Sequence, residues 1–173
     1  MSEVDEKITS LLSEDRYFEP PSEGSQHAWI NDIAQYQSTY DRSIEDLEGY
    51  WQERAEELVS WYTPWRSVLD ADLYKPEIRW FDGATLNVSY NCLDRHVEHG
   101  KGEKIALIWQ GEPEDEVRTY TYRQLLDEVC RCANVLKKKG VQKGDRVAVY
   151  LPMIPELVIS LLACARIGAI HSV

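Results

Sequence analysis

The stretch Arg146-Val-Ala-Val-Tyr150, followed by Pro155-Glu-Leu-Val-Ile-Ser-Leu-Leu-Ala-Cys-Ala-Arg-Ile167 and Ala169-Ile-His-Ser-Val173, decides the fold class. Its first part is β-branched and apolar, as in a strand. Pro155 lies at the start of a predicted helix, Gly168 closes that helix, and a second strand begins directly after it. Strand, helix and strand in this order predict the βαβ unit of a parallel α/β sheet.

In sheets of this kind, ligand sites lie in loops at the carboxyl ends of the strands. The sequence stops at Val173, inside the second predicted strand. The loop that would follow this strand is missing, so we expect the chain to be the front portion of a larger α/β enzyme.

The composition indicates a water-soluble protein. The chain has 173 residues, 43% of them hydrophobic, which is enough to bury a core. It contains no apolar run of the ~18 residues that span a membrane. Its acidic N-terminus has no basic region ahead of an apolar core, as a secretory signal would have. We therefore expect a cytoplasmic protein without a membrane partner.

The net charge of −11 is unevenly distributed. Residues 1–60 contain 15 Asp and Glu against 4 Lys and Arg, whereas residues 61–173 contain 15 of each. An acidic front repels phosphate backbones, which argues against a nucleic-acid partner. We interpret it as a solvated surface.

The four cysteines, Cys92, Cys130, Cys132 and Cys164, form no C-x-x-C pair and no metal-ligand spacing. Cys130 and Cys132 are two positions apart on a predicted helix, so their side chains point to different faces and neither bridge easily nor share a metal. The pattern favours reduced thiols in the core.

The segment Asp94-Arg-His-Val-Glu-His99 allows two interpretations. The imidazoles of His96 and His99 lie near Glu98 at one helix end and could bind a metal. Such a site takes further ligands from elsewhere, and only His27 and His171 remain as histidines. We favour the second interpretation, polar residues at a helix end that Gly100 closes.

The N-terminal region has a tail and a helical part. Residues 1–27 contain a short amphipathic pattern at Ile8, Leu11 and Leu12, and Pro20-Pro-Ser-Glu-Gly-Ser25 favours an extended or disordered tail. Apolar spacing from 32 to 61 predicts helices that are acidic outside and aromatic inside. Within them, Ser43 followed by Asp46 fits a helix start.

Four tryptophans lie within about thirty residues: Trp51, Trp61, Trp65 and Trp80. Aromatic rings can stack on a nucleotide base. Packing of the helical part against the body is the interpretation that we favour, because each ring buries roughly 150–250 Å².

The remaining residues predict alternating strands and helices. They are a strand over 77–81 with a turn at Asp82-Gly83, an amphipathic helix carrying Leu86, Tyr90, Leu93 and Val97, and strands over 104–110 and 117–121 that form a hairpin.

A capping box at Thr121 and Gln124 opens the next helix, which ends at Lys137-Lys-Lys139 and Gly140. These lysines complement the negative end of the helix dipole, although they could also grip a phosphate. The later helix over 155–167 is apolar nearly all round, so we expect it to be buried within the sheet layers.

The sequence lacks every common chemical motif. It has no G-x-G-x-x-G, G-x-x-x-x-G-K-[ST], G-x-S-x-G or H-E-x-x-H, and Gly100-x-Gly102 alone is a weak phosphate signal.

The order of local segments carries a resemblance. The segments are Trp80-Phe-Asp-Gly-Ala-Thr-Leu-Asn-Val-Ser-Tyr-Asn-Cys-Leu-Asp-Arg-His96, Ala106-Leu-Ile-Trp-Gln-Gly-Glu112, Thr119-Tyr-Thr-Tyr-Arg-Gln-Leu125, Gly144-Asp-Arg-Val-Ala-Val-Tyr-Leu-Pro-Met-Ile-Pro-Glu156 and Ala163-Cys-Ala-Arg-Ile-Gly-Ala-Ile-His-Ser172. From about Ile33 onward the chain resembles the N-terminal portion of AMP-forming acetyl-CoA synthetases, in the adenylate-forming superfamily. Cys132 stands where an aromatic residue is common, which we interpret as a packing change.

The resemblance implies an α/β fold. It predicts a flexible acidic tail over 1–30, a Trp-rich helical N-terminal extension over 31–85, and an incomplete AMP-binding domain over 86–173. In the parent enzyme, acetate attacks Mg-ATP to give acetyl-adenylate and diphosphate, and coenzyme A then takes the acetyl group and releases AMP.

The family's phosphate loop, its ATP-binding aspartate and arginine, its acetate pocket and its C-terminal lysine all lie beyond Val173. The resemblance therefore assigns no catalytic, cofactor-binding or metal-binding residue to this chain, and we expect the isolated chain to be inactive and to bind no cofactor tightly.

Two alternatives stay open. The chain could be an interaction or regulatory module that docks on a full-length enzyme, for example through an exposed sheet edge. The parent could also be a propionyl-CoA synthetase, which uses the same mechanism.

Overall fold

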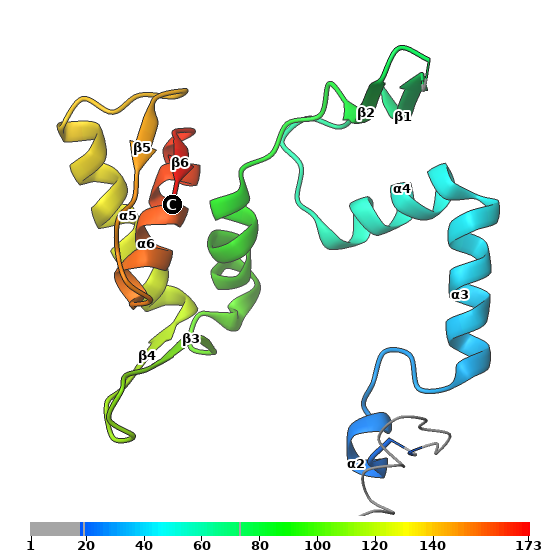
Figure 1. Cartoon of the computed structure of the whole chain (residues 1–173), viewed down its shortest axis with the longest axis horizontal. Coiled ribbons are helices and arrows are strands. Elements are labelled where there is room, and N and C mark those ends of the chain that lie inside the picture. Colours follow the sequence, from blue (N-terminus) through cyan, green and yellow to red (C-terminus); the bar gives the residue numbers. More distant parts are fainter. Residues whose placement is uncertain (1–17, 19, 73) are drawn as a thin grey trace, which may run out of the picture. The chain divides into compact units, whose positions relative to one another are not determined.

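The computed structural model describes residues 18, 20–72 and 74–173 (Figure 1). The chain divides into two compact units, of which the first ends at Tyr50 and the second begins at Trp51. The predicted amphipathic pattern at Ile8, Leu11 and Leu12 lies outside the described residues.

The first unit is helical. Helix α2 (Ser22–Ser25) is a single turn in which the Pro21 carbonyl accepts from the backbone N–H of Gly24 and Ser25. The expectation of an extended chain at these residues was therefore wrong. Helix α3 (Ile33–Glu45) begins after Asp32, whose carboxylate accepts from the Gln35 N–H at 2.8 Å.

Helix α4 (Leu47–Leu58) begins later than its predicted start. The Ser43 hydroxyl donates to the Tyr40 carbonyl inside α3, whereas Asp46 accepts from the Gly49 N–H at 3.1 Å. The cap is thus Asp46 alone, which satisfies one of the free N–H groups of the first turn. The prediction that aromatic residues face inward was also wrong for α3, which has no buried residue.

In the second unit, β1 (Ser67–Asp72) and β2 (Glu77–Asp82) form an antiparallel pair. Strand β1 was not predicted, because aspartate and alanine are poor strand formers and its sequence is Ser-Val-Leu-Asp-Ala-Asp. The predicted strand at 77–81 and the turn at Gly83, which has φ 79°, are confirmed.

The tryptophans pack against one another at this hairpin. Trp61 and Trp65 meet edge to face with ring centroids 5.3 Å apart, and both contact Phe81. Trp51 contacts Trp80 at 6.5 Å, also edge to face. The packing interpretation of the four rings is confirmed.

The predicted amphipathic helix spans residues 88–101, with wider π-helical turns at η1 (Tyr90–Asp94) and η2 (Val97–Lys101). Leu93 is buried at 2% exposure, whereas Leu86 precedes the helix and is exposed. Helical geometry ends at His99 and Gly100, whose φ is 77°, so the predicted closure is confirmed.

Strands β3 (Ile105–Gln110) and β4 (Val117–Thr121) form the predicted antiparallel hairpin. Helix α5 (Tyr122–Lys138) follows it directly. Both halves of the capping box form: the Gln124 N–H donates to the Thr121 hydroxyl at 3.2 Å, and the Thr121 N–H donates to the Gln124 side chain at 2.9 Å.

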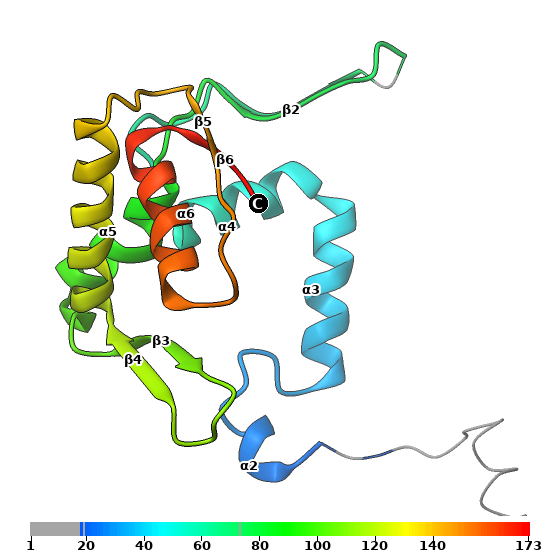
Figure 2. The ribbon, with the colours of Figure 1, turned by 60° about the vertical axis from the view of Figure 1, so that its left-hand side comes forward.

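The predicted βαβ unit is confirmed. Strand β5 (Arg146–Ala148), helix α6 (Pro155–Ile167) and strand β6 (Ile170–Ser172) follow in order, and β5 pairs with β6 in parallel (Figure 2). Gly168 closes α6 with φ 76°.

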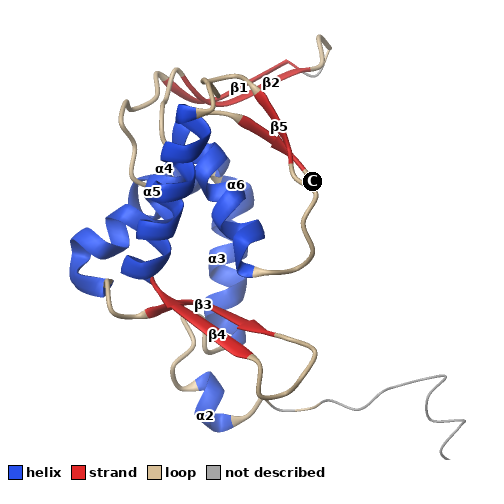
Figure 3. Ribbon diagram, turned by 90° about the vertical axis from the view of Figure 1, so that its left-hand side faces the viewer, coloured by secondary structure: helices blue, strands red, loops and turns tan. Residues whose placement is uncertain are grey.

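Helices α5 and α6 lie side by side and enclose the core (Figure 3). The core residues are Leu93, Leu125, Val129, Ala133, Ile159 and Ala163. Burial of α6 all round was predicted, but only five of its residues are buried, because the described sheet beside it has two strands. Among the described residues, the helices are all too short or too polar to cross a membrane.

Candidate functional site

The carboxyl ends of β5 and β6 form the edge at which ligands bind in open parallel sheets. Strand pairing continues one residue past β5, because the Val149 N–H donates to the Ser172 carbonyl at 2.8 Å. Val149 is buried at this edge, whereas Tyr150 and Met153 in the following loop are almost fully exposed. The loop over 149–154 therefore lies at the edge where this fold places ligand sites.

Contacts from the β3–β4 hairpin hold this loop. The Trp109 indole N–H donates to the Met153 carbonyl at 2.6 Å, and Arg118 lies over the Trp109 ring at 4.4 Å. Arg118 also pairs with Glu156 in the first turn of α6 at 3.1 Å. The hairpin thus fixes the point where the loop enters α6.

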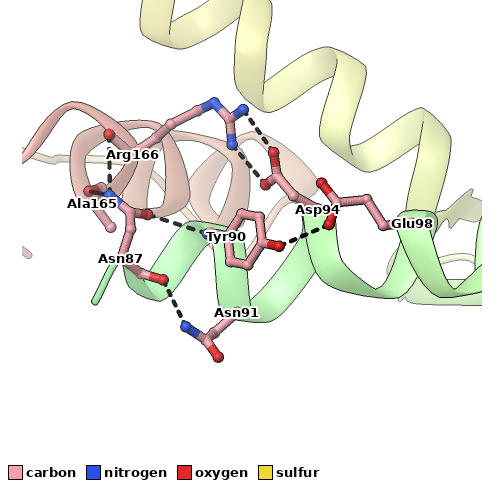
Figure 4. A network of polar contacts seen from close by, with 7 residues as sticks. All are labelled: Asn87, Tyr90, Asn91, Asp94, Glu98, Ala165 and Arg166. Atoms are coloured by element: carbon pink, nitrogen blue, oxygen red, sulfur yellow. Dashed lines mark hydrogen bonds and ion pairs between the residues drawn. The ribbon is translucent and has the colours of Figure 1, made fainter. Parts of the chain in front are cut away.

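A second set of contacts, here called the polar network, fixes the other end of α6. It consists of Asn87, Tyr90, Asn91, Asp94, Glu98 and Arg166 (Figure 4). The Asn87 amide donates to the carbonyls of Ala165 and Arg166 at 3.0 and 3.2 Å. Its oxygen accepts from the Tyr90 N–H at 3.1 Å. One side chain therefore caps the end of α6 and the start of the 88–101 helix.

The Asp94–Arg166 pair is the strongest ionic contact of the network. Two parallel bonds of 2.7 and 2.8 Å join the guanidinium to the carboxylate. The side chains are only 28% and 15% exposed, so water screens the pair weakly. The hydrogen bond to Asp94 raises the pKa of the Arg166 guanidinium above its ordinary range.

The network also reaches the end of α4. Asn91 exchanges two hydrogen bonds with the Ser60 backbone, at 2.7 and 2.9 Å, and Arg95 donates to the Leu58 carbonyl at 2.7 Å. The 88–101 helix therefore connects residues 58–60 on one side with the end of α6 on the other.

These groups supply positioning rather than proton transfer. A hydrogen bond from the Tyr90 hydroxyl to Glu98 raises the pKa of Tyr90 above its ordinary value of 10.0. Burial lowers the pKa of His96 below its ordinary value of 6.5, and its ring packs on Tyr122 at 4.8 Å. The Arg166–Asp94 ion pair and the Asn87 hydrogen bonds hold the end of α6 and the start of the 88–101 helix in place.

His96 and His99 lie near the end of the 88–101 helix. His96 packs on Tyr122, and the His99 ring contacts the Arg95 carbonyl. Within the ranges that the structure describes, no three His, Cys, Asp or Glu residues are grouped closely enough to hold a metal ion. Lys137 and Lys138 lie in the last turn of α5, where the dipole interpretation placed them.

The four cysteines are free, as predicted. Cys164 is fully buried, Cys130 and Cys132 are half-buried, and Cys92 is exposed. The prediction of core thiols was wrong for Cys92, whose side chain is exposed.

Sequence reasoning missed the polar network. Asp94 and Arg166 are 72 positions apart, and neither lies in a motif. The one available signal was Asn87, a strong helix-capping residue directly ahead of an amphipathic helix.

Comparison with known proteins gives a consistent result along the chain. A family model described as "Acetyl-coenzyme A synthetase N-terminus" matches residues 36–92, and one described as "AMP-binding enzyme" matches residues 93–173. The chain is 48% identical over 162 residues to acetyl-coenzyme A synthetase of Halorhodospira halophila, covering 94% of this chain and 25% of the relative.

Two further relatives agree. Acetyl-coenzyme A synthetase 2 of Pseudomonas aeruginosa is 50% identical over 153 residues, covering 88% of this chain and 23% of the relative. The solved structure of acetoacetyl-CoA synthetase from Streptomyces lividans aligns with TM-score 0.70 and 30% identity over 86% of this chain and 22% of that one.

The fold and these matches define the N-terminal region of an AMP-binding enzyme. The chain belongs to the acetyl-coenzyme A synthetase family of this class and spans about a quarter of the length of the relatives that it matches.

Proposed function

We propose that this chain is the N-terminal part of an AMP-forming acetate–CoA ligase. The complete enzyme converts acetate, ATP and coenzyme A to acetyl-CoA, AMP and diphosphate through acetyl-adenylate. Identity of 48–50% to two acetyl-coenzyme A synthetases across nearly the whole chain is the observation that carries this proposal.

The proposed role of this part is to position the carboxyl edge of the parallel strands. The hairpin contacts fix the loop over 149–154, and the polar network fixes the turn from α6 into β6. Positioning of reacting groups accounts for a large share of catalysis in phosphoryl and acyl transfer.

The described residues do not fit a Mg-ATP site. They contain no phosphate-binding glycine loop and no group of three potential metal ligands. We therefore propose that no catalytic, cofactor-binding or metal-binding residue of the ligase lies in this chain, and we assign no step through Mg²⁺, ATP or coenzyme A to it.

The proposal keeps three parts: an acidic tail over 1–30, a helical extension over 31–85 and the start of the AMP-binding domain over 86–173. A boundary at 85/86 leaves the 88–101 helix intact. The four free thiols support a reducing compartment such as the cytoplasm. The docking-module alternative is not favoured, because the relatives carry this region within their own longer chains.

A chimera tests the proposal. This chain replaces the matching quarter of the Pseudomonas aeruginosa relative, and acetate-dependent exchange of diphosphate into ATP is measured. We expect exchange in the chimera and none in the isolated chain or in the relative deprived of its own first quarter. A chimera that folds but shows no exchange contradicts the proposal, as does exchange by the isolated chain.

A further inference from the structure

A cleft of about 690 Å³ lies at the opposite edge of the parallel strands, by their amino ends. The last turns of α5, the turn over 140–145 and the end of α6 form its walls. Its polar lining residues are Asn134, Lys137, Gln142, Lys143 and Arg166. The proposed ligase chemistry does not use this cleft, which contains Lys137 of the lysine run that could grip a phosphate.

The cleft is positively charged within an acidic protein. Lys137, Lys143 and Arg166 come from three different elements, whereas the whole chain carries a net charge of −11. Among the described residues, no carboxylate forms an ion pair with Lys137 or Lys143, and Asp94 is the partner of Arg166. The aliphatic part of Lys143 lies close to Gly168, which holds this lysine beside the end of α6.

Two helix C-termini meet here, and exposed carbonyl groups at such ends would repel an anion. Internal donors occupy most of these carbonyls. The N–H groups of Lys139, Gly140 and Val141 donate to carbonyls in the last turn of α5. At the end of α6, the N–H groups of Gly168 and Ala169 do the same, and the Asn87 amide adds two bonds.

The remaining donors suit a phosphate group. Asp94 occupies one hydrogen of each terminal nitrogen of Arg166, which leaves its other N–H donors available in a fixed orientation. Lys137 and Lys143 add two mobile ammonium groups, and the Asn134 and Gln142 amides add neutral donors. The carboxylate of Asp145, in the turn over 140–145, accepts from the Gln142 backbone N–H at 2.8 Å.

From this charge and donor set, we propose that the cleft between the ends of α5 and α6 binds a small phosphate anion carrying two or more negative charges. The site is separate from the carboxyl edge that the ligase proposal uses. Either free diphosphate or the phosphate of a mononucleotide could supply this chemistry.

The test is a titration of the 173-residue chain with sodium diphosphate at low ionic strength, followed by NMR of backbone amides and by calorimetry. We expect millimolar binding with the largest shifts at residues 134–143 and 166. Lys137→Gln and Lys143→Gln should each weaken binding roughly fivefold, the effect of one unit charge at about 4 Å in water. Lys138→Gln removes the same charge from the same helical turn outside the cleft, so it should weaken binding less than about twofold.

A parallel titration with AMP distinguishes the two sources: equal affinity assigns the site to phosphate groups in general, and weaker binding assigns it to free diphosphate. Alkylation of Cys130, which lines the cleft, gives a second readout. Diphosphate should slow it while leaving Cys92 unchanged. The proposal is overturned if no binding occurs at about 20 mM diphosphate, well above the expected millimolar dissociation constant, or if Lys138→Gln weakens binding as much as Lys137→Gln. Neither result bears on the chimera experiment.

Discussion

Replacing Asp94 by asparagine should destabilise the second unit by about 2–3 kcal/mol. The change leaves the Arg166 guanidinium, 28% exposed, without its carboxylate while keeping the size of the side chain. Breaking a fully buried pair costs roughly 3–5 kcal/mol, and an exposed pair contributes about 0–1 kcal/mol. With 15% exposure at Asp94, the pair lies nearer the buried limit.

Equilibrium unfolding in urea, followed by tryptophan fluorescence, measures the effect. With a slope of about 2 kcal/mol per molar urea, the midpoint should fall by roughly 1–1.5 M. Glu128→Gln is the matched control, because its partner Arg131 is 72% exposed. It should change the free energy of unfolding by less than about 0.5 kcal/mol.

A double-variant cycle separates the pair from its surroundings. Arg166→Met alone should also destabilise, and the double variant Asp94→Asn, Arg166→Met should lose less than the sum of the two. Two results would show that the bidentate contact does not fix the end of α6. One is an equal loss of unfolding free energy in Asp94→Asn and Glu128→Gln. The other is a double variant whose loss equals the sum of the losses of Asp94→Asn and Arg166→Met.

Four further outcomes are expected. Ser89→Ala should leave the free energy of unfolding unchanged or raise it by about 1 kcal/mol, because the Ser89 hydroxyl is buried without a hydrogen-bond partner among the described residues. A loss above about 0.5 kcal/mol in urea unfolding would show that this hydroxyl has a partner. Thr121→Ala should cost about 1 kcal/mol and Thr119→Ala, outside the cap, clearly less, by the same assay. Because burial holds the pKa of folded His96 below 6.5, the free energy of unfolding should fall as the pH drops from 6.5 through that lower pKa. His96→Gln should flatten this pH dependence, whereas His99→Gln should keep it. Equal slopes in the unchanged chain and both variants would refute this prediction. In the folded chain Cys92 should react first with a disulfide reagent and Cys164 last, because Cys92 is exposed and burial raises the pKa of the Cys164 thiol. Peptide mass mapping identifies the modified cysteines, and early modification of Cys164 would contradict its burial.

Local chemistry made much of the fold predictable. Thr121 and Gln124 determine where α5 begins, and Gly168 determines where α6 ends, because each acts on backbone groups within a few residues. Leu125, Val129 and Ala133 recur at helical spacing and form the buried face of α5. The βαβ unit followed from the order of such signals.

The failures have a common cause, which is dependence on residues distant in the sequence. Strand β1 contains two aspartates and forms through its pairing with β2, where Leu69 lies opposite Trp80. Burial of a helix all round requires neighbours on every side, and β5 and β6 cover only part of α6. The candidate site depended on long-range contacts in the same way, since nothing near Asp94 in the sequence indicates Arg166.

The polar network also bears on how the two matched family regions relate. The matches meet between residues 92 and 93, in the middle of the 88–101 helix. Asn87 and Asn91, on the N-terminal side of this border, bind the end of α6 and the Ser60 backbone, while Asp94 beyond it binds Arg166. Cutting the chain at this border would remove the cap of α6 and half of a helix whose Leu93 lies in the core. Within the second unit, residues 51–92 therefore complete the body that carries β5 and β6, because they hold the end of α6 from which the chain continues into β6.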